Sequence, residues 1–181
     1  MNKTIIAIIT LLAFAFISFG KDTLKENTPH VNQMYATGGN NNANNPAPNF
    51  ILTSSKGKKI KLSDYKGKVV IVDFWATWCP PCRRGIPDLI EIQKEFGKHV
   101  VVIGISMDTD TKRDVVPFIQ QMGINYPVAY ATPEVVQSYG GVESIPSSFV
   151  IDKKGNIIES YIGLVSKSDF TSVIKKLLNK S

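Results

Sequence analysis

The pattern of apolar and polar positions predicts one folded domain over residues 50–181. Two apolar runs, 69–75 with one acid inside and 100–105, fit strands that are covered on both faces, as in a parallel sheet. Between them, the stretch 80–96 carries apolar residues at helical spacing and is followed by Gly97. Strand, helix and strand in this order imply a right-handed crossover and parallel pairing.

The sequence pattern in the remainder of the domain predicts shorter elements around this unit. The expected elements are a hairpin at 50–52 and 59–62, a helix at 111–122, a strand at 126–130, a helix at 133–139, a hairpin at 148–151 and 156–162, and a final helix at 168–178. Ser166 or Ser168 is the expected cap of the final helix. We therefore predict an α/β fold with a mixed central sheet, flanked by helices and preceded by a β-hairpin extension.

Residues 1–20 have the layout of a secretory signal peptide, with Lys3 before an apolar run and the small residues Ser18 and Gly20 at its end. The run, residues 5–19, is 15 residues long, which is short for crossing a bilayer. An uncleaved anchor that tethers the protein to the membrane is the alternative. In both cases we expect an extracytoplasmic domain, either periplasmic or secreted.

Residues 21–49 differ in composition from the domain that follows them. They contain the pair Gly38-Gly39, five asparagines between positions 40 and 45, and the segment Pro46-Ala47-Pro48. This composition is typical of a disordered, flexible tether. The domain then holds the 132 residues from 50 to 181, which is enough for a single core.

Composition and charge exclude several classes of protein. The chain has 43% hydrophobic residues and two cysteines, which fits neither a multi-span membrane protein nor a small disulfide-stapled domain. Its net charge of +6 comes from scattered basic residues, with small groups at 56–61 and 175–180. A solvated surface is the favoured interpretation of these groups, with an anionic partner as the alternative. Nothing in the pattern indicates a nucleic-acid partner.

Both cysteines lie where the first buried strand passes into the helix. Cys79 and Cys82 form a C-x-x-C motif, which is typical of redox activity at such a junction. Residues three apart on a helical turn bring their Cβ atoms within roughly 5–6 Å, so a disulfide can open and close there. The positive end of the helix favours a thiolate. We expect Cys79 to be the exposed nucleophile and Cys82 to be the buried thiol that resolves a mixed disulfide.

The neighbours of the cysteines are expected to shape the site. Pro81 suits the first helical turn because its missing N–H would have no partner there, and Pro80 and Pro81 together restrict the loop. Trp78 adjoins the nucleophile and is expected to shape substrate access. For Trp75, packing in the core and support of the site are equally good interpretations.

Two other roles for the cysteine pair compete with redox activity. A structural disulfide here closes a loop too small to stabilise the chain much. A metal site needs more ligands, and neither His30 nor His99 is placed in the sequence to supply one; copper(I) is the metal that fits best. We therefore expect no metal and no other cofactor, and a redox-inert or copper-handling binding module is the alternative function.

The segment 72–82, with the sequence Val-Asp-Phe-Trp-Ala-Thr-Trp-Cys-Pro-Pro-Cys, resembles the active-site segment of the thioredoxin fold. More narrowly, it resembles that of the TlpA/ResA-like extracytoplasmic thiol-disulfide oxidoreductases. The resemblance runs from Pro46 to about Leu178 and includes the segments 46–50, 62–68 and 145–152. It implies a thioredoxin-like fold, a cis peptide bond before Pro146 that faces the cysteines, and an acid in the central strand at Asp73.

The resemblance also implies a function. It indicates reduction of disulfides in extracytoplasmic proteins by a Cys79/Cys82 dithiol-disulfide cycle. A membrane-bound thiol electron donor returns the pair to its dithiol form. Asp73 acts in this scheme as the base for Cys82, because a desolvated carboxylate has a raised pKa and exchanges a proton near neutrality. The alternative is a solvated or hydrogen-bonded acid with no catalytic role. We also predict that the backbone of Ile145, beside Pro146, is able to pair with an extended substrate strand.

Two patterns separate this chain from related activities. Many members that act in cytochrome c maturation carry a glutamate three residues after the second cysteine, where this chain has Gly85. This difference weakens the inference that this chain acts on the same specialised substrate as those members. Peroxiredoxins follow the pattern P-x-x-x-T-x-x-C, but counting back from Cys79 gives Ala76 and Val72. A thiol peroxidase is therefore disfavoured.

Overall fold

The computed structural model describes residues 45–179. The predicted signal peptide, residues 1–20, and most of the predicted tether lie outside the described residues. The last part of that tether, residues 45–49, contacts the domain: Pro46 forms an antiparallel bridge with Asn156. The Ala47 N–H donates to the carbonyl oxygen of Gly155 at 2.9 Å. Backbone groups of this segment thus pair with the turn that precedes β7 (Ile157–Ile162).

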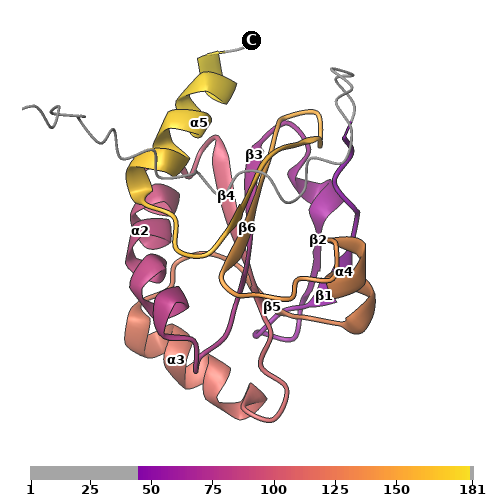
Figure 1. Ribbon diagram of the computed structural model, residues 1–181, viewed down its shortest axis with the longest axis vertical. Helices are drawn as coiled ribbons and strands as arrows, with labels where there is room; N and C mark the ends of the chain where they lie inside the picture. The colour runs from indigo at the N-terminus through magenta and orange to yellow at the C-terminus, as the bar shows by residue number, and fades with distance from the viewer. Residues whose placement is uncertain (1–44, 180–181) are drawn as a thin grey trace, which may run out of the picture. The chain divides into compact units, whose positions relative to one another are not determined.

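A five-stranded mixed sheet forms the centre of the domain (Figure 1). In spatial order its strands are β5 (Val128–Tyr130), β4 (Val100–Ser106), β3 (Val69–Trp75), β6 (Ser147–Ile151) and β7 (Ile157–Ile162). Strand β4 pairs in parallel with β3 and β5, whereas β6 pairs antiparallel with β3 and β7. Every residue of β3 and β4 is buried, as their continuous apolar runs predict.

Helices and a small hairpin cover the two faces of this sheet. The remaining elements are β1 (Ile51–Thr53), β2 (Lys59–Lys61), η1 (Leu62–Tyr65), α2 (Pro80–Phe96), η2 (Lys112–Asp114), α3 (Val115–Met122), α4 (Pro133–Ser138) and α5 (Lys167–Asn179). Figure 1 shows α2, α3 and α5 on one side of the sheet, and the β1–β2 hairpin with α4 on the other. The predicted helix 111–122 is divided into the 3₁₀ turn η2 and helix α3. Within the described residues, none of the helices is long and apolar enough to span a bilayer.

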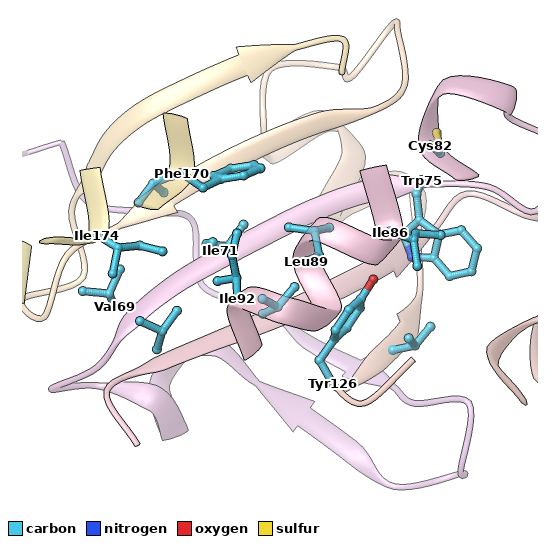
Figure 2. Packing of buried hydrophobic residues seen from close by; sticks show 14 of the residues in the cluster. Val69, Ile71, Trp75, Cys82, Ile86, Leu89, Ile92, Tyr126, Phe170 and Ile174 are labelled. Carbon is cyan, nitrogen blue, oxygen red and sulfur yellow. The ribbon is translucent and has the colours of Figure 1, made fainter. Parts of the chain in front are cut away.

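The alternation of side chains along β3 divides the core into two layers. Val69, Ile71 and Trp75 face helices α2, α3 and α5, whereas Val70 and Phe74 face the hairpin and α4. Figure 2 shows the first layer, in which residues of α2 lie over the sheet. Because residues of a strand point alternately to opposite faces, Asp73 shares the face of the first layer. The redox motif and the acid of the central strand therefore lie on the same side of the sheet.

Trp75 belongs to the core. Its side chain is fully buried and stacks on Phe118 with ring centroids 5.4 Å apart. Strand β4 passes close beneath it at Gly104, where an added Cβ atom would lie 2.7 Å from the indole nitrogen of Trp75. The same atom would lie 3.2 Å from the ring of Tyr126. The glycine therefore makes room for two aromatic side chains.

We expect Gly104→Ala to lower the free energy of unfolding by about 1–3 kcal/mol, because the added methyl group overpacks the core. Urea denaturation of the oxidised protein measures this loss. In a Trp75→Phe background the clashing indole nitrogen is gone, so the cost of Gly104→Ala should shrink. An unchanged cost in that background would contradict the steric explanation.

Candidate active site

The end of β3 and the beginning of α2 hold the two cysteines. Cys79 is the N-cap residue of α2, and its sulfur accepts a hydrogen bond from the backbone N–H of Cys82 at 3.3 Å. Pro80 and Pro81 occupy the first turn, where an N–H group would have no partner in the helix. Cys79 and Cys82 form a disulfide with their Cα atoms 5.3 Å apart. The helix N-terminus that favours a thiolate thus points at the sulfur of Cys79.

The exposure of the cysteines differs from the prediction. Cys79 was expected to be more exposed than Cys82, but each residue is 3% exposed in the disulfide form. The loop before β6 covers Cys79, whose sulfur lies 3.7 Å from the carbonyl oxygen of Ile145. What distinguishes the two sulfurs is their surroundings: Cys79 lies under this loop, and Cys82 lines a cavity deeper in the domain.

The loop at Pro146 lies beside the redox pair, as the resemblance implied. The peptide bond between Ile145 and Pro146 is cis. The carbonyl oxygen of Pro146 accepts a hydrogen bond at 2.8 Å from the N–H of Gly163, which follows β7. Next to Cys79 in the sequence, Trp78 is 60% exposed, and Pro80 is also exposed. These exposed groups and the loop carbonyl form the surface around the disulfide.

Asp73 is buried in β3 on the side of the cysteines. Only 4% of the residue is exposed, and burial raises its pKa to about 7. Asp73, Cys82 and Pro146 all line a cavity of about 10 Å³, which is space for about one water molecule. A carboxyl group with this pKa can accept or release a proton near neutrality, so it is suited to exchange a proton with Cys82 through such a water molecule.

Ser148 is a functional neighbour that sequence reasoning missed. It lies directly opposite Asp73 in the pairing of β3 with β6, and its hydroxyl donates a hydrogen bond to the carboxylate at 2.7 Å. This bond lowers the pKa of Asp73 and so opposes the effect of burial. A signal was present in the sequence, because a serine inside the buried strand β6 needs a polar partner.

We expect Ser148→Ala to raise the pKa of Asp73 by about 1 unit, because a hydrogen bond to a charged group contributes ~1.5 kcal/mol or more. Titration of the Asp73 carboxyl carbon by NMR measures the change. The matched control is Ser147→Ala: this neighbour bonds to the carbonyl of Ser144 and has the opposite side-chain direction in the strand. Equal shifts in both variants would contradict a specific role of Ser148.

A second buried acid, Asp108, holds the loop that precedes Cys79. It follows β4, is 5% exposed, and accepts a hydrogen bond from the Thr77 N–H at 3.0 Å. Its carboxylate also accepts bonds from the hydroxyl groups of Thr77, Ser106 and Thr111. Sequence reasoning missed this network, although polar residues directly after a buried strand were a signal for it. The network fixes the backbone between Trp75 and the nucleophile.

The described part of the chain gives no set of metal ligands. No three His, Cys, Asp or Glu side chains within residues 45–179 lie close enough to hold a metal ion. His99 precedes β4 and donates its backbone N–H to Phe96, far along α2 from the cysteines. His30 lies outside the described residues.

Comparison with known proteins places these features in a family. The model of the AhpC/TSA family matches residues 43–160, which include both cysteines, Asp73 and Pro146. The chain belongs to the AhpC/TSA family. A curated relative, "Thiol-disulfide oxidoreductase ResA" of Bacillus thuringiensis (strain Al Hakam), is 39% identical over 132 residues, which cover 72% of this chain and 76% of the relative.

Solved structures confirm the thioredoxin-like fold. A thiol:disulfide interchange protein of the thioredoxin family from Chlorobium tepidum TLS superposes with a TM-score of 0.71 at 38% identity, covering 77% of this chain and 99% of that one. A secreted thiol-disulfide isomerase from Corynebacterium glutamicum gives a TM-score of 0.69 at 27% identity, covering 74% and 86%. The relatives and the disulfide-bonded C-x-x-C pair agree on thiol-disulfide oxidoreductase chemistry.

Proposed function

We propose that this protein reduces disulfide bonds of extracytoplasmic proteins through cycles of Cys79 and Cys82. The observation that carries the proposal is the arrangement at the start of α2. A disulfide-bonded pair at a helix N-terminus lies between a loop carbonyl 3.7 Å from one sulfur and a cavity that the other sulfur shares with a buried acid. This arrangement gives different surroundings to Cys79, which attacks the substrate disulfide, and to Cys82, which resolves the mixed disulfide.

The first step uses the outer side of the pair. The Cys79 thiolate attacks one sulfur of a substrate disulfide, the substrate S–S bond breaks, and the departing sulfur takes up a proton from solvent. The backbone of Ile145 lies beside Cys79, where it can pair with an extended substrate segment. Trp78, Pro80 and Pro81 adjoin the nucleophile and contact the substrate in this scheme.

The second step uses the inner side. Cys82 gives its proton to the Asp73 carboxylate, and its sulfur attacks Cys79. The bond between Cys79 and the substrate breaks, the second substrate thiol is released, and the Cys79–Cys82 disulfide forms. The structure represents this oxidised end of the cycle. A thiol electron donor in the membrane then returns the pair to the dithiol form.

The proposed location is outside the cytoplasm. The signal-like segment 1–20 supports export, and the relative from Corynebacterium glutamicum is described as secreted. Oxidising compartments hold the disulfide-bonded proteins on which such an enzyme acts. A tether through residues 5–19 would keep the domain next to a membrane-bound donor.

The reduction potential of the pair tests the direction of the reaction. A reductase needs a potential near that of thioredoxin, about −270 mV, whereas a strong oxidant lies near about −120 mV. Equilibration with glutathione buffers of known potential, followed by quantification of the two forms by mass spectrometry, gives the value. A potential near the oxidant value would overturn the reductase direction. A pair that neither exchanges with glutathione nor reduces a protein disulfide would indicate the redox-inert binding module.

A further inference from the structure

Leu164 has an unusual position for an apolar residue. It follows β7, is 50% exposed, and directs its side chain toward Gly85 of α2. A Cβ atom added to Gly85 would lie only 3.0 Å from the Cδ1 atom of Leu164. The missing side chain at position 85 therefore leaves the space that Leu164 occupies.

Leu164 lines the same cavity as Asp73 and Cys82. The cavity is lined by Asp73, Cys82, Gly85, Leu89, Pro146, Ser148, Gly163, Leu164, Val165 and Phe170. Asp73 and Cys82 are 4% and 3% exposed, whereas Leu164 is the most exposed residue of this lining and Gly85, Gly163 and Val165 are partly exposed. The lining thus runs from a buried acid and a buried thiol to a leucine that is half exposed to solvent.

We propose that Leu164 is a positioning residue that closes the cavity of Asp73 and Cys82 to bulk water, and that Gly85 provides its seat. The inference rests on the proposed function and deepens it, because it assigns a residue that controls the resolving step. Leu164 touches no reacting atom in this scheme. It acts by keeping the volume between carboxyl and thiol at the size of about one water molecule.

Exclusion of water matters for the proton that moves in this step. The proton passes from the Cys82 thiol to the Asp73 carboxylate, while the electron pair of the Cys82 sulfur forms the bond to Cys79. The sulfur of the substrate leaves with the electrons of the broken bond and takes a proton from solvent. Burial is the larger cause of the raised pKa of Asp73, so access of water would make the carboxylate a weaker base.

Among the described residues, few other groups near Asp73 carry or exchange charge. Cys82 faces it from α2, and Ser148 donates a hydrogen bond from β6. Tyr126, just before β5, is the other titratable neighbour: burial raises the pKa of its hydroxyl, and the charge of Asp73 raises it further. Figure 2 shows this hydroxyl pointing into the core beneath α2. Gly163, Val165 and Phe170 contribute only uncharged groups from the side of α5.

Leu164→Ala tests the proposal by two measurements on the folded protein. Titration of the Asp73 carboxyl carbon should show its pKa lowered by about 1 unit, because water enters the cavity. Stopped-flow reaction of the reduced protein with the aromatic disulfide DTNB should release thiol in two phases, attack and resolution. We expect the pH midpoint of the resolution phase to fall by the same amount and its plateau rate to fall about threefold, because a weaker base accepts the proton less readily.

Two control variants distinguish opening of the Asp73 cavity from the mere removal of an exposed apolar side chain. Ile162→Ala removes a side chain of similar exposure, 49%, that does not line the cavity, so it should leave both measurements at the parental values. Leu164→Met refills the space and should restore the pKa and the midpoint. An Asp73 pKa in Leu164→Ala equal to that of the parent would overturn the proposal, as would an equal shift in Ile162→Ala.

The carboxyl titration also distinguishes this proposal from the proposed function. It requires no disulfide exchange, so it reports closure even if Asp73 is not the base. If Asp73→Asn resolves the mixed disulfide at the parental rate, the role of Asp73 in the proposed function fails. A lowered pKa in Leu164→Ala would then still support the closure of the cavity, and an unchanged pKa would refute it.

Discussion

Cys79→Ser is expected to abolish disulfide exchange, whereas Cys82→Ser should keep the first attack and accumulate mixed disulfides. The reason is the different position of the two sulfurs. Cys79 caps α2 and lies 3.7 Å from the carbonyl oxygen of Ile145, the residue that we propose pairs with a substrate strand. Cys82 lies one turn inside and lines the cavity of Asp73. Incubation with a peptide disulfide and mass spectrometry distinguish the two outcomes.

The order of alkylation provides an independent check on the assignment. Both cysteines are equally buried in the disulfide form, so the check is made on the reduced protein. At pH 7, iodoacetamide should modify Cys79 first, because the helix N-terminus favours its thiolate. A double Cys79→Ser, Cys82→Ser variant controls for alkylation of other side chains. Faster modification of Cys82 would reverse the two roles.

Asp73→Asn should slow resolution of the mixed disulfide by roughly 10²–10⁴-fold, the usual contribution of a general base. Asparagine keeps the shape of the side chain but does not accept the proton of Cys82. In the parent the rate of resolution should rise with pH around 7, because burial raises the pKa of Asp73 to about 7 and the carboxyl must be ionised to act as a base. Attack by Cys79 should be nearly unchanged.

The two phases of the DTNB reaction separate these effects. The parental midpoint near pH 7 should be missing from the resolution phase of Asp73→Asn, and the first phase serves as the internal control. Resolution at the parental rate between pH 6 and 8 would make Asp73 a structural residue. The mechanism would then need another base or water alone.

The same substitution should also stabilise the fold at high pH. The pKa of Asp73 is raised from 3.8 to about 7 on folding, so the folded state holds its proton more tightly than the unfolded chain. The stability from this proton is fully present below pH ~4 and is lost as pH rises to about 7, at a cost of up to roughly 4 kcal/mol. Asp73→Asn should therefore gain stability over the parent at pH 8, and urea denaturation at pH 4 and 8 measures the difference.

Local patterns in the sequence predicted most elements and the redox motif. The buried strand 69–75, the helix 80–96 and the strand 100–105 were predicted within one residue, because continuous apolar runs and helical spacing are properties of neighbouring residues. The C-x-x-C motif was placed at the helix start for the same reason. No local pattern indicated the bridge between Pro46 and Asn156, because these residues are more than a hundred positions apart in the chain.

The cis bond before Pro146 and its place beside the cysteines came from the resemblance to a family, since periodicity carries no information about either. The prediction that Cys79 is the more exposed cysteine failed for a related reason. The cover over Cys79 is the loop at Ile145, and no local feature of the C-x-x-C segment indicates how closely that loop approaches.

The sequence by itself determined that two cysteines stand at the start of a helix behind a buried strand that carries an acid. Only the tertiary structure decided what surrounds them. The register of β3 against β6 places the Ser148 hydroxyl in hydrogen-bond contact with Asp73. The end of β4 brings Asp108 into hydrogen-bond contact with Thr77. The segment after β7 places the Leu164 side chain next to Gly85. These partners are 75, 31 and 79 positions apart in the chain, and such distant contacts follow from how strands pair and layers pack, which spacing along the chain does not specify.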